Sequence, residues 1–416
     1  MPRFRNVFTG IVAVVYALAI TAGFAAPASA EDGLTDTEIV LGGTHPYSGP
    51  ASAYGAVGKG IAAYFGYVND HGGVYGRKIT YKDLDDSYSP PQAVQLVRQL
   101  VEQDKVFAMF NTLGTAVNIA IRPYLNQQGV PQLIVATGAS TFARDYKQYP
   151  MTTIGNPDYQ SEAIVYAQYV LKEKPNAKVA ILYQNDDFGQ DYVTGFKTGL
   201  GSHDGMITKM ASYETSDPDV SSQISSLKGS GADTILIAAT PKFATQALVA
   251  VAQQSWKATV ILTNVSASQS VMRAAAKAGS TAAVEGVVSM LYGKDPADPK
   301  YANDPGMKLY KDAMAKYNPG ADPSNGIYSA GFAYAYTMVE ALKAAGKQLT
   351  RAKLMDVFSH LNITDNPLLL PGIVIHTTPT NRFAITQLQV VKYTSGEWKA
   401  FGGLTDARPY IKEEKG

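Results

Sequence analysis

The amino-acid sequence contains no cysteine, and that absence narrows what the protein can be. A chain without thiols has no disulfide framework, so its stability must come from hydrophobic cores, which 416 residues are enough to build. Attachment to a membrane through a lipidated cysteine is excluded for the same reason. Tryptophan is scarce, whereas 26 tyrosines supply apolar rings with one polar tip, which suit ligand clefts although most will pack in or beside the core.

Excess charge, metal-binding spacing and long apolar runs are also missing. Lys and Arg total 36 against 35 Asp and Glu, without a basic tract, so nothing favours nucleic acid or an anionic membrane as a partner. No apolar stretch beyond residue 30 is long enough to span a bilayer, so the mature protein is expected to be soluble. The five histidines lack metal-ligand spacing, so no metal site is expected.

Catalytic motifs are absent as well. No Gly-x-Ser-x-Gly elbow supplies a hydrolase nucleophile. The run from Gly55 to Gly60 superficially resembles a phosphate loop, but no Ser or Thr follows Lys59 and the run lies in a helical pattern. The paired carboxylates Asp85 and Asp86 are expected to hold a loop instead of doing acid/base work. We therefore expect no enzyme, no catalytic residue and no cofactor.

The N-terminal thirty residues read as an export signal. Arg3 and Arg5 precede an apolar run over 7–24, and Ala28-Ser29-Ala30 is a small-residue cleavage pattern. An uncleaved anchor is the alternative, but glycine, threonine and proline interrupt the run. We expect cleavage after Ala30, which changes the formal charge from +1 to −1 and delivers the protein to the periplasm.

Strand and helix patterns then alternate in two blocks. The first block begins with a strand over 38–43, a helix over 56–70 and a strand over 78–83, and the second begins with a helix over 160–171. A long last strand is expected over 384–393 and helices over 328–345 and 352–361. This pattern predicts an α/β fold with two doubly wound parallel-sheet lobes and three crossings between them. We assign residues 31–153 with 287–375 to an N-terminal lobe and residues 154–286 with 376–416 to a C-terminal lobe.

A Gly/Pro/Ser-rich loop interrupts the first strand-to-helix step, between Val40 and Tyr54. In a parallel sheet such a loop lies at the carboxyl ends of the strands, where small ligands bind. An exported chain that opens in this way, without a catalytic motif, is typical of a capture protein.

Several segments match a known family in order along the chain. They are 46–50 with Tyr54 and Gly55, then 69–79, 85–90, 130–133, 188–191 and 231–233. With these segments the sequence resembles the type I periplasmic solute-binding proteins of bacterial ABC importers, in the leucine/isoleucine/valine-binding branch. The resemblance implies two α/β lobes, a ligand held in the cleft between them by hinge closure, and no catalysis.

The resemblance also implies site residues. It places an aromatic contact at Tyr54, a hydroxyl at Thr115 for the ligand carboxylate, and a second-lobe aromatic at Phe188. Thr115 serves equally well as a helix cap. The remaining ligand-binding candidates are Tyr47, Gly114, Ala136, Thr137, Gly138, Pro157, Thr240 and Asn264.

The family pairs the ligand ammonium with an acidic residue, and this sequence has Asn264 there. A buried ammonium without an anion costs several kcal/mol, so we expect a carboxylate without an α-amino group, either aromatic or a short organic acid. The alternative is a branched-chain or other amino acid or amide bound in the same way, with Asp186 or Glu285 as substitute anions.

The partners implied are a small-molecule carboxylate and the ABC permease subunits of the inner membrane, with the binding protein itself a monomer. A ligand sensor that presents its closed form to a signalling partner shares every sequence feature, and is kept as an alternative.

Overall fold

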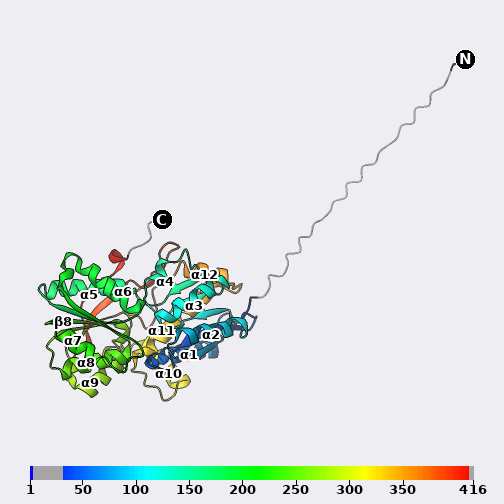
Figure 1. Ribbon diagram of the computed structural model, residues 1–416. Coiled ribbons are helices and arrows are strands. Elements are labelled where there is room, and N and C mark those ends of the chain that lie inside the picture. Colours follow the sequence, from blue (N-terminus) through cyan, green and yellow to red (C-terminus); the bar gives the residue numbers. More distant parts are fainter. Residues whose placement is uncertain (3–30, 412–416) are drawn as a thin grey trace. The chain divides into compact units, whose positions relative to one another are not determined.

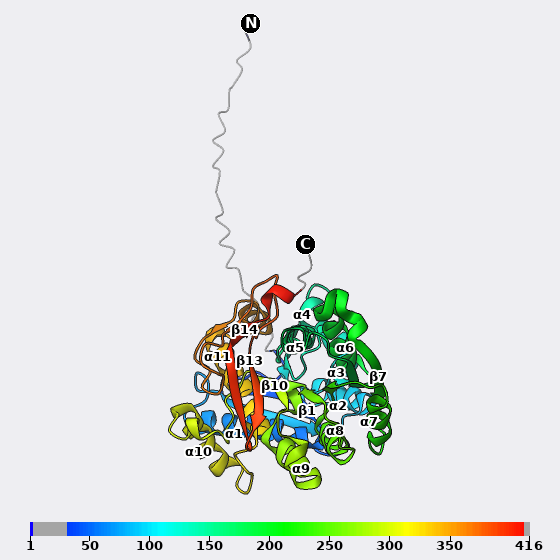
Figure 2. The ribbon, with the colours of Figure 1, turned by 90° about the vertical axis from the view of Figure 1, so that its left-hand side faces the viewer.

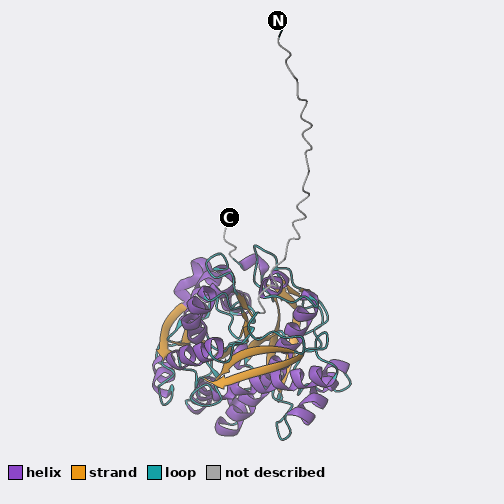
Figure 3. Ribbon diagram, turned by 90° about the vertical axis from the view of Figure 1, so that its right-hand side faces the viewer, coloured by secondary structure: helices purple, strands orange, loops and turns teal. Residues whose placement is uncertain are grey.

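The computed structural model describes residues 1–2 and 31–411, so the predicted signal segment lies outside the described residues apart from its first two. Residues 31–411 belong to one compact unit that contains two main sheets with helices on both faces of each (Figures 1 and 3). None of the helices described is long and apolar enough to cross a membrane.

The first sheet has five strands, all parallel, in the order β2-β1-β3-β4-β5. The strands are β1 (Glu38–His45), β2 (Lys78–Asp85), β3 (Ala108–Phe110), β4 (Gln132–Val135) and β5 (Thr152–Ile154). The helices that go with this sheet are α1 (Gly55–Asp70), α2 (Pro90–Glu102), α3 (Thr115–Gln127), α4 (Thr141–Arg144), α10 (Pro305–Tyr317), α11 (Gly326–Ala345) and α12 (Arg351–Phe358).

The second sheet has seven strands in the order β14-β13-β10-β9-β8-β6-β7. They are β6 (Val179–Gln184), β7 (Ile207–Tyr213), β8 (Thr234–Ala238), β9 (Thr259–Leu262), β10 (Val288–Leu291), β13 (Gln387–Thr394) and β14 (Glu397–Asp406). Its helices are α5 (Tyr159–Glu173), α6 (Asp187–Leu200), α7 (Ser221–Lys228), α8 (Pro241–Gln253) and α9 (Gln269–Gly279). The hairpin β13–β14 is antiparallel and lies beside β10 (Figure 2).

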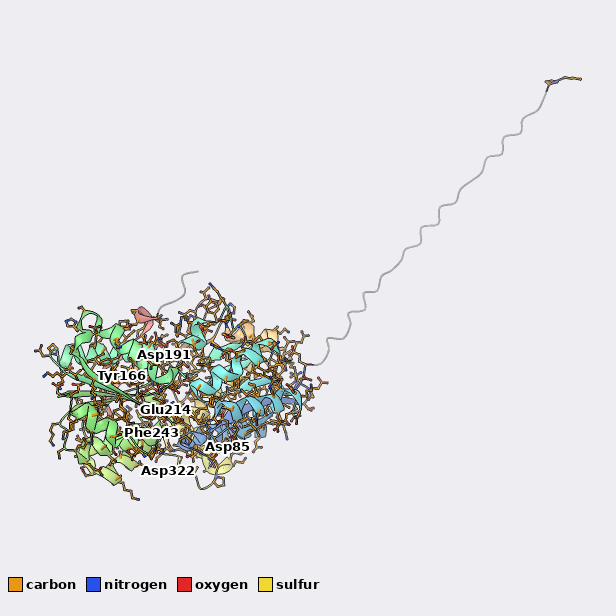
Figure 4. All side chains as sticks on the ribbon, in the orientation of Figure 1. Asp85, Tyr166, Asp191, Glu214, Phe243 and Asp322 are labelled. Carbon is orange, nitrogen blue, oxygen red and sulfur yellow. The ribbon has the colours of Figure 1, made fainter. Side chains whose placement is uncertain are left out.

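Three segments connect the two sheets. The chain leaves the first sheet after β5, returns to its helices after β10, and crosses again between the short strand pair β11 (Asn362–Ile363) and β12 (Ile375–His376) and strand β13. Figure 4 places Asp85 on the blue first half and Tyr166 and Phe243 on the green second half. The fold is thus α/β with two mostly parallel sheets and a three-segment connection, as predicted.

Several details differ from the sequence-based expectations. Strand β10 pairs with β9 and β13, so the return toward the first sheet begins after Leu291 and not at 287. Residues 384–386 precede β13 as an irregular segment, so the expected last strand begins late. Strands β5, β10 and β14 and helices α4, α9 and α10 are among the elements that were not predicted.

Two glycines explain how α11 packs along α1. A Cβ atom on Gly60 would lie 2.0 Å from the carbonyl oxygen of Tyr328, and one on Gly331 would lie 2.0 Å from that of Val57. The backbones can approach this closely only because both positions lack a side chain. The run from Gly55 to Gly60 lies in α1, as its helical pattern predicts, and Gly60 allows the close packing of α11.

Candidate functional site

A cavity of about 180 Å3 lies among loops that follow strands of both sheets. From the side of the first sheet it is bordered by Tyr54, by Gly114 and Thr115 at the start of α3, and by Ala136 after β4. From the side of the second sheet it is bordered by Phe188, Thr240 and Asn264, after β6, β8 and β9. Seven of the eleven predicted site residues thus meet around one cavity, because parallel strands bring their carboxyl ends to the same edge.

The central wall of the cavity is aromatic. Tyr159 is the first residue of α5, and its ring meets that of Phe188 edge to face, with centroids 5.2 Å apart. Asp158 caps α5 by accepting a hydrogen bond from the backbone N–H of Ser161, at 2.8 Å. This cap fixes the start of the helix and so the position of Tyr159. Tyr54, Tyr159 and Phe188 are at most 9% exposed, so their rings offer an apolar and nearly dry surface.

Only part of the predicted carboxylate site is open to a ligand. The Oγ1 atoms of Thr115 and Thr137 lie 2.6 Å apart. The N–H of Ala136 donates to the carbonyl of Thr112 at 2.9 Å, and the N–H of Thr137 to that of Val135 at 2.8 Å. These two backbone donors are therefore occupied, and what remains is the hydroxyl of Thr115 with the first turn of α3.

Four predicted residues do not border the cavity: Tyr47, Thr137, Gly138 and Pro157. The hydroxyl of Tyr47 donates to Asp83, with the oxygens 2.5 Å apart, and the ring of His45 lies 2.9 Å from the same carboxylate. Gly138 and Pro157 serve packing, because a Cβ on Gly138 would lie 2.1 Å from the carbonyl oxygen of Pro157. Their local patterns indicated loops near the site, but not which way each side chain points.

A buried carboxylate that the sequence analysis did not identify lies directly behind Asn264. Glu162, in the first turn of α5, accepts hydrogen bonds from the hydroxyls of Tyr166 and Tyr192, at 2.7 and 2.9 Å. It also accepts from the backbone N–H of Asn264, at 2.9 Å, and from its side-chain amide. Burial raises the pKa of Glu162 to about 7, against the effect of these four donors.

The contact with Glu162 fixes the orientation of Asn264. Because the amide nitrogen donates to the carboxylate, the side chain keeps its Oδ1 as an acceptor, and no described residue donates to that atom. The two substitute anions are engaged elsewhere: Asp186 caps α6 through the N–H of Gly189, and Glu285 accepts from the N–H of Ser395. No sequence signal marks Glu162, since it looks like an ordinary acidic residue in the first turn of a helix.

The cavity extends well beyond the predicted residues. One extension borders the connecting segment from Tyr292 to Asp295 and the start of α11. Another part of the lining, which we call the inner arm, comes from α11, α12 and the segment after them: Thr337, Phe358, Leu361, Asn366, Leu369, Ile375, Thr377, Arg382 and Ile385. The lining holds two cations, Lys294 and Arg382. Residues far apart in sequence form this arm, so local patterns could not reveal it.

Two sheets joined by three connecting segments, with a cavity between them, define a cleft-type binding protein. The chain belongs to the periplasmic binding protein family, whose model matches residues 38–397. The Leu/Ile/Val-binding protein homolog 3 of Brucella melitensis is 31% identical over 223 residues, 53% of this chain and 57% of that protein. The match thus spans little more than half the length of that relative.

Solved structures share the fold at lower identity. A branched-chain amino acid ABC transporter protein from Thermus thermophilus with bound valine has a TM-score of 0.79 at 16% identity, covering 91% of this chain and 99% of that one. A solute-binding protein from Rhodopseudomonas palustris BisB5 in complex with 3,4-dihydroxybenzoic acid scores 0.74 at 21%, covering 91% and 99%. A fatty acid ABC transporter substrate-binding protein from Thermomonospora curvata scores 0.73 at 21%, covering 91% and 96%.

Proposed function

We propose that this protein is the extracytoplasmic solute-binding component of an ABC importer, and that it captures a small carboxylate with an aromatic or aliphatic body. The observation that carries the proposal is the cavity walled by Tyr54, Tyr159 and Phe188 between the two sheets. Residues 1–30 direct export to the periplasm, where cleavage after Ala30 releases the mature chain, and a membrane permease accepts the liganded form.

The size of the cavity limits the ligand. A cavity of roughly 150 Å3 with apolar walls holds one benzene molecule. At about 180 Å3 the cavity here suits a single-ring acid or a short aliphatic acid, and is small for a long-chain fatty acid. Both a benzoic acid derivative and valine, the ligands of two proteins with the same fold, meet that limit.

Capture proceeds by hinge closure. One lobe comprises residues 31–153 and the helices after β10, and the other comprises 154–291 with the last two strands. The hydroxyl of Tyr54, from the first lobe, lies 3.2 Å from the carbonyl oxygen of Val265 in the second. The backbone N–H of Ser140 likewise donates to Asp191, at 2.9 Å, and Asp191 lies beside the first-lobe helices in Figure 4. Ligand favours the closed form through contacts that the open form lacks.

A second candidate ligand is a branched-chain amino acid. Glu162 favours it, because the carboxylate lies one side chain behind the cavity and polarises the amide of Asn264, whose Oδ1 can accept from an ammonium. A ligand sensor for a signalling partner would use the same site and the same closure.

Calorimetry on the mature chain, Glu31–Gly416, tests the proposal. Benzoate, 4-hydroxybenzoate, hexanoate, leucine and valine are titrated in turn, with turnover followed by mass spectrometry. We expect one of the amine-free acids to bind in the micromolar range or tighter and to be recovered unchanged. Tight binding of leucine alone would select the second candidate, and conversion to a product would refute a binding role.

A further inference from the structure

The inner arm of the cavity holds polar groups that are nearly all satisfied by the protein. The side-chain amide of Asn366 donates to the carbonyl of Ala333, at 3.0 Å, and to the hydroxyl of Thr337. The hydroxyl of Thr377 donates to the carbonyl of Phe358, at 2.8 Å. These groups have no need of a ligand, and the remaining walls are aliphatic or aromatic.

Arg382 is the exception. Its Nε and Nη1 atoms are buried and make no hydrogen bond to any described residue. Leaving a buried charged donor without a partner costs more free energy than leaving a buried neutral one. Two of the three guanidinium nitrogens therefore have no acceptor among the described residues, and a ligand could supply one.

The two cations of the lining differ in their neighbours. The ammonium group of Lys294 lies 2.6 Å from a carboxylate oxygen of Asp304, so its charge is balanced. The guanidinium of Arg382 has no carboxylate partner among the described residues, and its nearest charge-stabilising group is the ring of Tyr146, 5.7 Å from Cζ. Burial accordingly lowers the pKa of Arg382 from its usual value.

The predicted carboxylate site at Thr115 and Ala136 is a poorer place for an anion. There the N–H groups of Ala136 and Thr137 already donate to carbonyl oxygens, and the hydroxyl of Thr115 is shared with that of Thr137. A ligand carboxylate at Thr115 would find few free hydrogen-bond donors. A carboxylate at Arg382 would contact a positive charge and form a stronger, charge-assisted hydrogen bond.

We propose that Arg382 anchors the ligand carboxylate and that the ligand body lies in the inner arm. This inference rests on the proposed binding function and names its substrate class: a carboxylic acid with an aromatic ring or a short aliphatic chain next to the carboxyl group. An α-amino acid fits poorly, because its ammonium would lie within a few atoms of the guanidinium and among apolar walls.

Matched acid and amide pairs test the assignment. Benzoate with benzamide, and hexanoate with hexanamide, are titrated into the mature wild-type chain and into the R382Q, R382K and R98Q variants. Arg98 is an exposed residue of α2 that pairs with Glu102, so R98Q removes the same charge away from the cavity. Thermal unfolding of each variant without ligand verifies that it is folded.

We expect the wild-type protein to prefer the acid over its amide, and R382Q to lose at least tenfold in affinity for the acid while its amide affinity stays within twofold. R382K, which keeps the charge, should retain part of the preference, and R98Q all of it. If R382Q fails to fold, R382K provides the test. We expect its ratio of acid affinity to amide affinity to be lower than that of the wild type.

Two results would overturn the inference. If an acid binds R382Q as tightly as it binds the wild type, Arg382 does not anchor the carboxylate, although the proposed binding function stands. Loss of the acid preference in Thr115→Val, with R382Q unaffected, would place the carboxylate at the start of α3. If no acid of the panel binds the wild-type protein, the carboxylate function itself fails.

Discussion

The hydroxyl group of Tyr54 donates a hydrogen bond to the backbone carbonyl of Val265, with the two oxygens 3.2 Å apart. Tyr54 ends the short helical turn Ser52–Tyr54 after β1, and Val265 follows β9, so one side chain links elements of both sheets across the cavity. The same ring borders the cavity, so Tyr54 has two roles that substitution can separate.

We expect Tyr54→Phe to keep the ring and lose only the bond to Val265. One hydrogen bond is worth about 0.5–1.5 kcal/mol, so ligand affinity should fall by a factor of about 2 to 12. Tyr54→Ala also removes the ring and should weaken binding further, with the protein still folded. Calorimetry gives both affinities, and small-angle scattering reports whether the ligand-bound variants remain closed. Equal affinity in all three proteins would contradict the placement of the site.

The buried carboxylate of Glu162 predicts a pH dependence of stability. Its pKa is raised to about 7 from an ordinary value of 4.5, so the folded state holds a proton that the unfolded chain releases between those values. The folded state binds more protons in this window, so the free energy of unfolding should fall as pH rises from about 4.5 to about 7. The difference is of the order of 3 kcal/mol.

Glu162→Gln isolates this effect, because glutamine has a similar size and does not titrate. Buried groups such as Asp191, with a pKa raised to about 6, act in both proteins and cancel in the difference. Urea unfolding at several pH values should give a variant whose stability falls less steeply than that of the wild type. Parallel profiles would show that the pKa of Glu162 is not raised in the folded state.

The close contact between α1 and α11 predicts that one added methyl group lowers the stability of the protein. In Gly331→Ala the new Cβ would lie 2.0 Å from the carbonyl oxygen of Val57, so the helices must move apart. Overpacking of this kind costs typically 1–3 kcal/mol. Gly205→Ala is the control, because a Cβ atom on Gly205 would have no heavy atom within 4 Å. Gly320→Ala is unsuitable, because Gly320 has a positive φ of 89°. Denaturant unfolding should show a loss for Gly331→Ala and little change for Gly205→Ala.

The sequence predicts the α/β alternation because buried parallel strands are short apolar runs and the helices have a clear apolar face. The sequence-based prediction missed α10, although Met307, Tyr310 and Met314 give that helix a buried apolar face. It also missed β14, which has one buried side chain among mostly exposed ones. At the cavity, loops after strands were predictable from topology. Arg382 was not, since it follows no strand and reaches the cavity only through the path of residues 361–385.

Strand β10 lies between β9 and β13. Its residue Val288 pairs with Ile261 of β9, 27 residues earlier, whereas β13 begins about a hundred residues later. During synthesis one edge of β10 therefore stays unpaired until almost the whole chain has been made. Long-range pairing of this kind slows folding. The larger sheet is therefore complete only when the last two strands of the chain, β13 and β14, have been made.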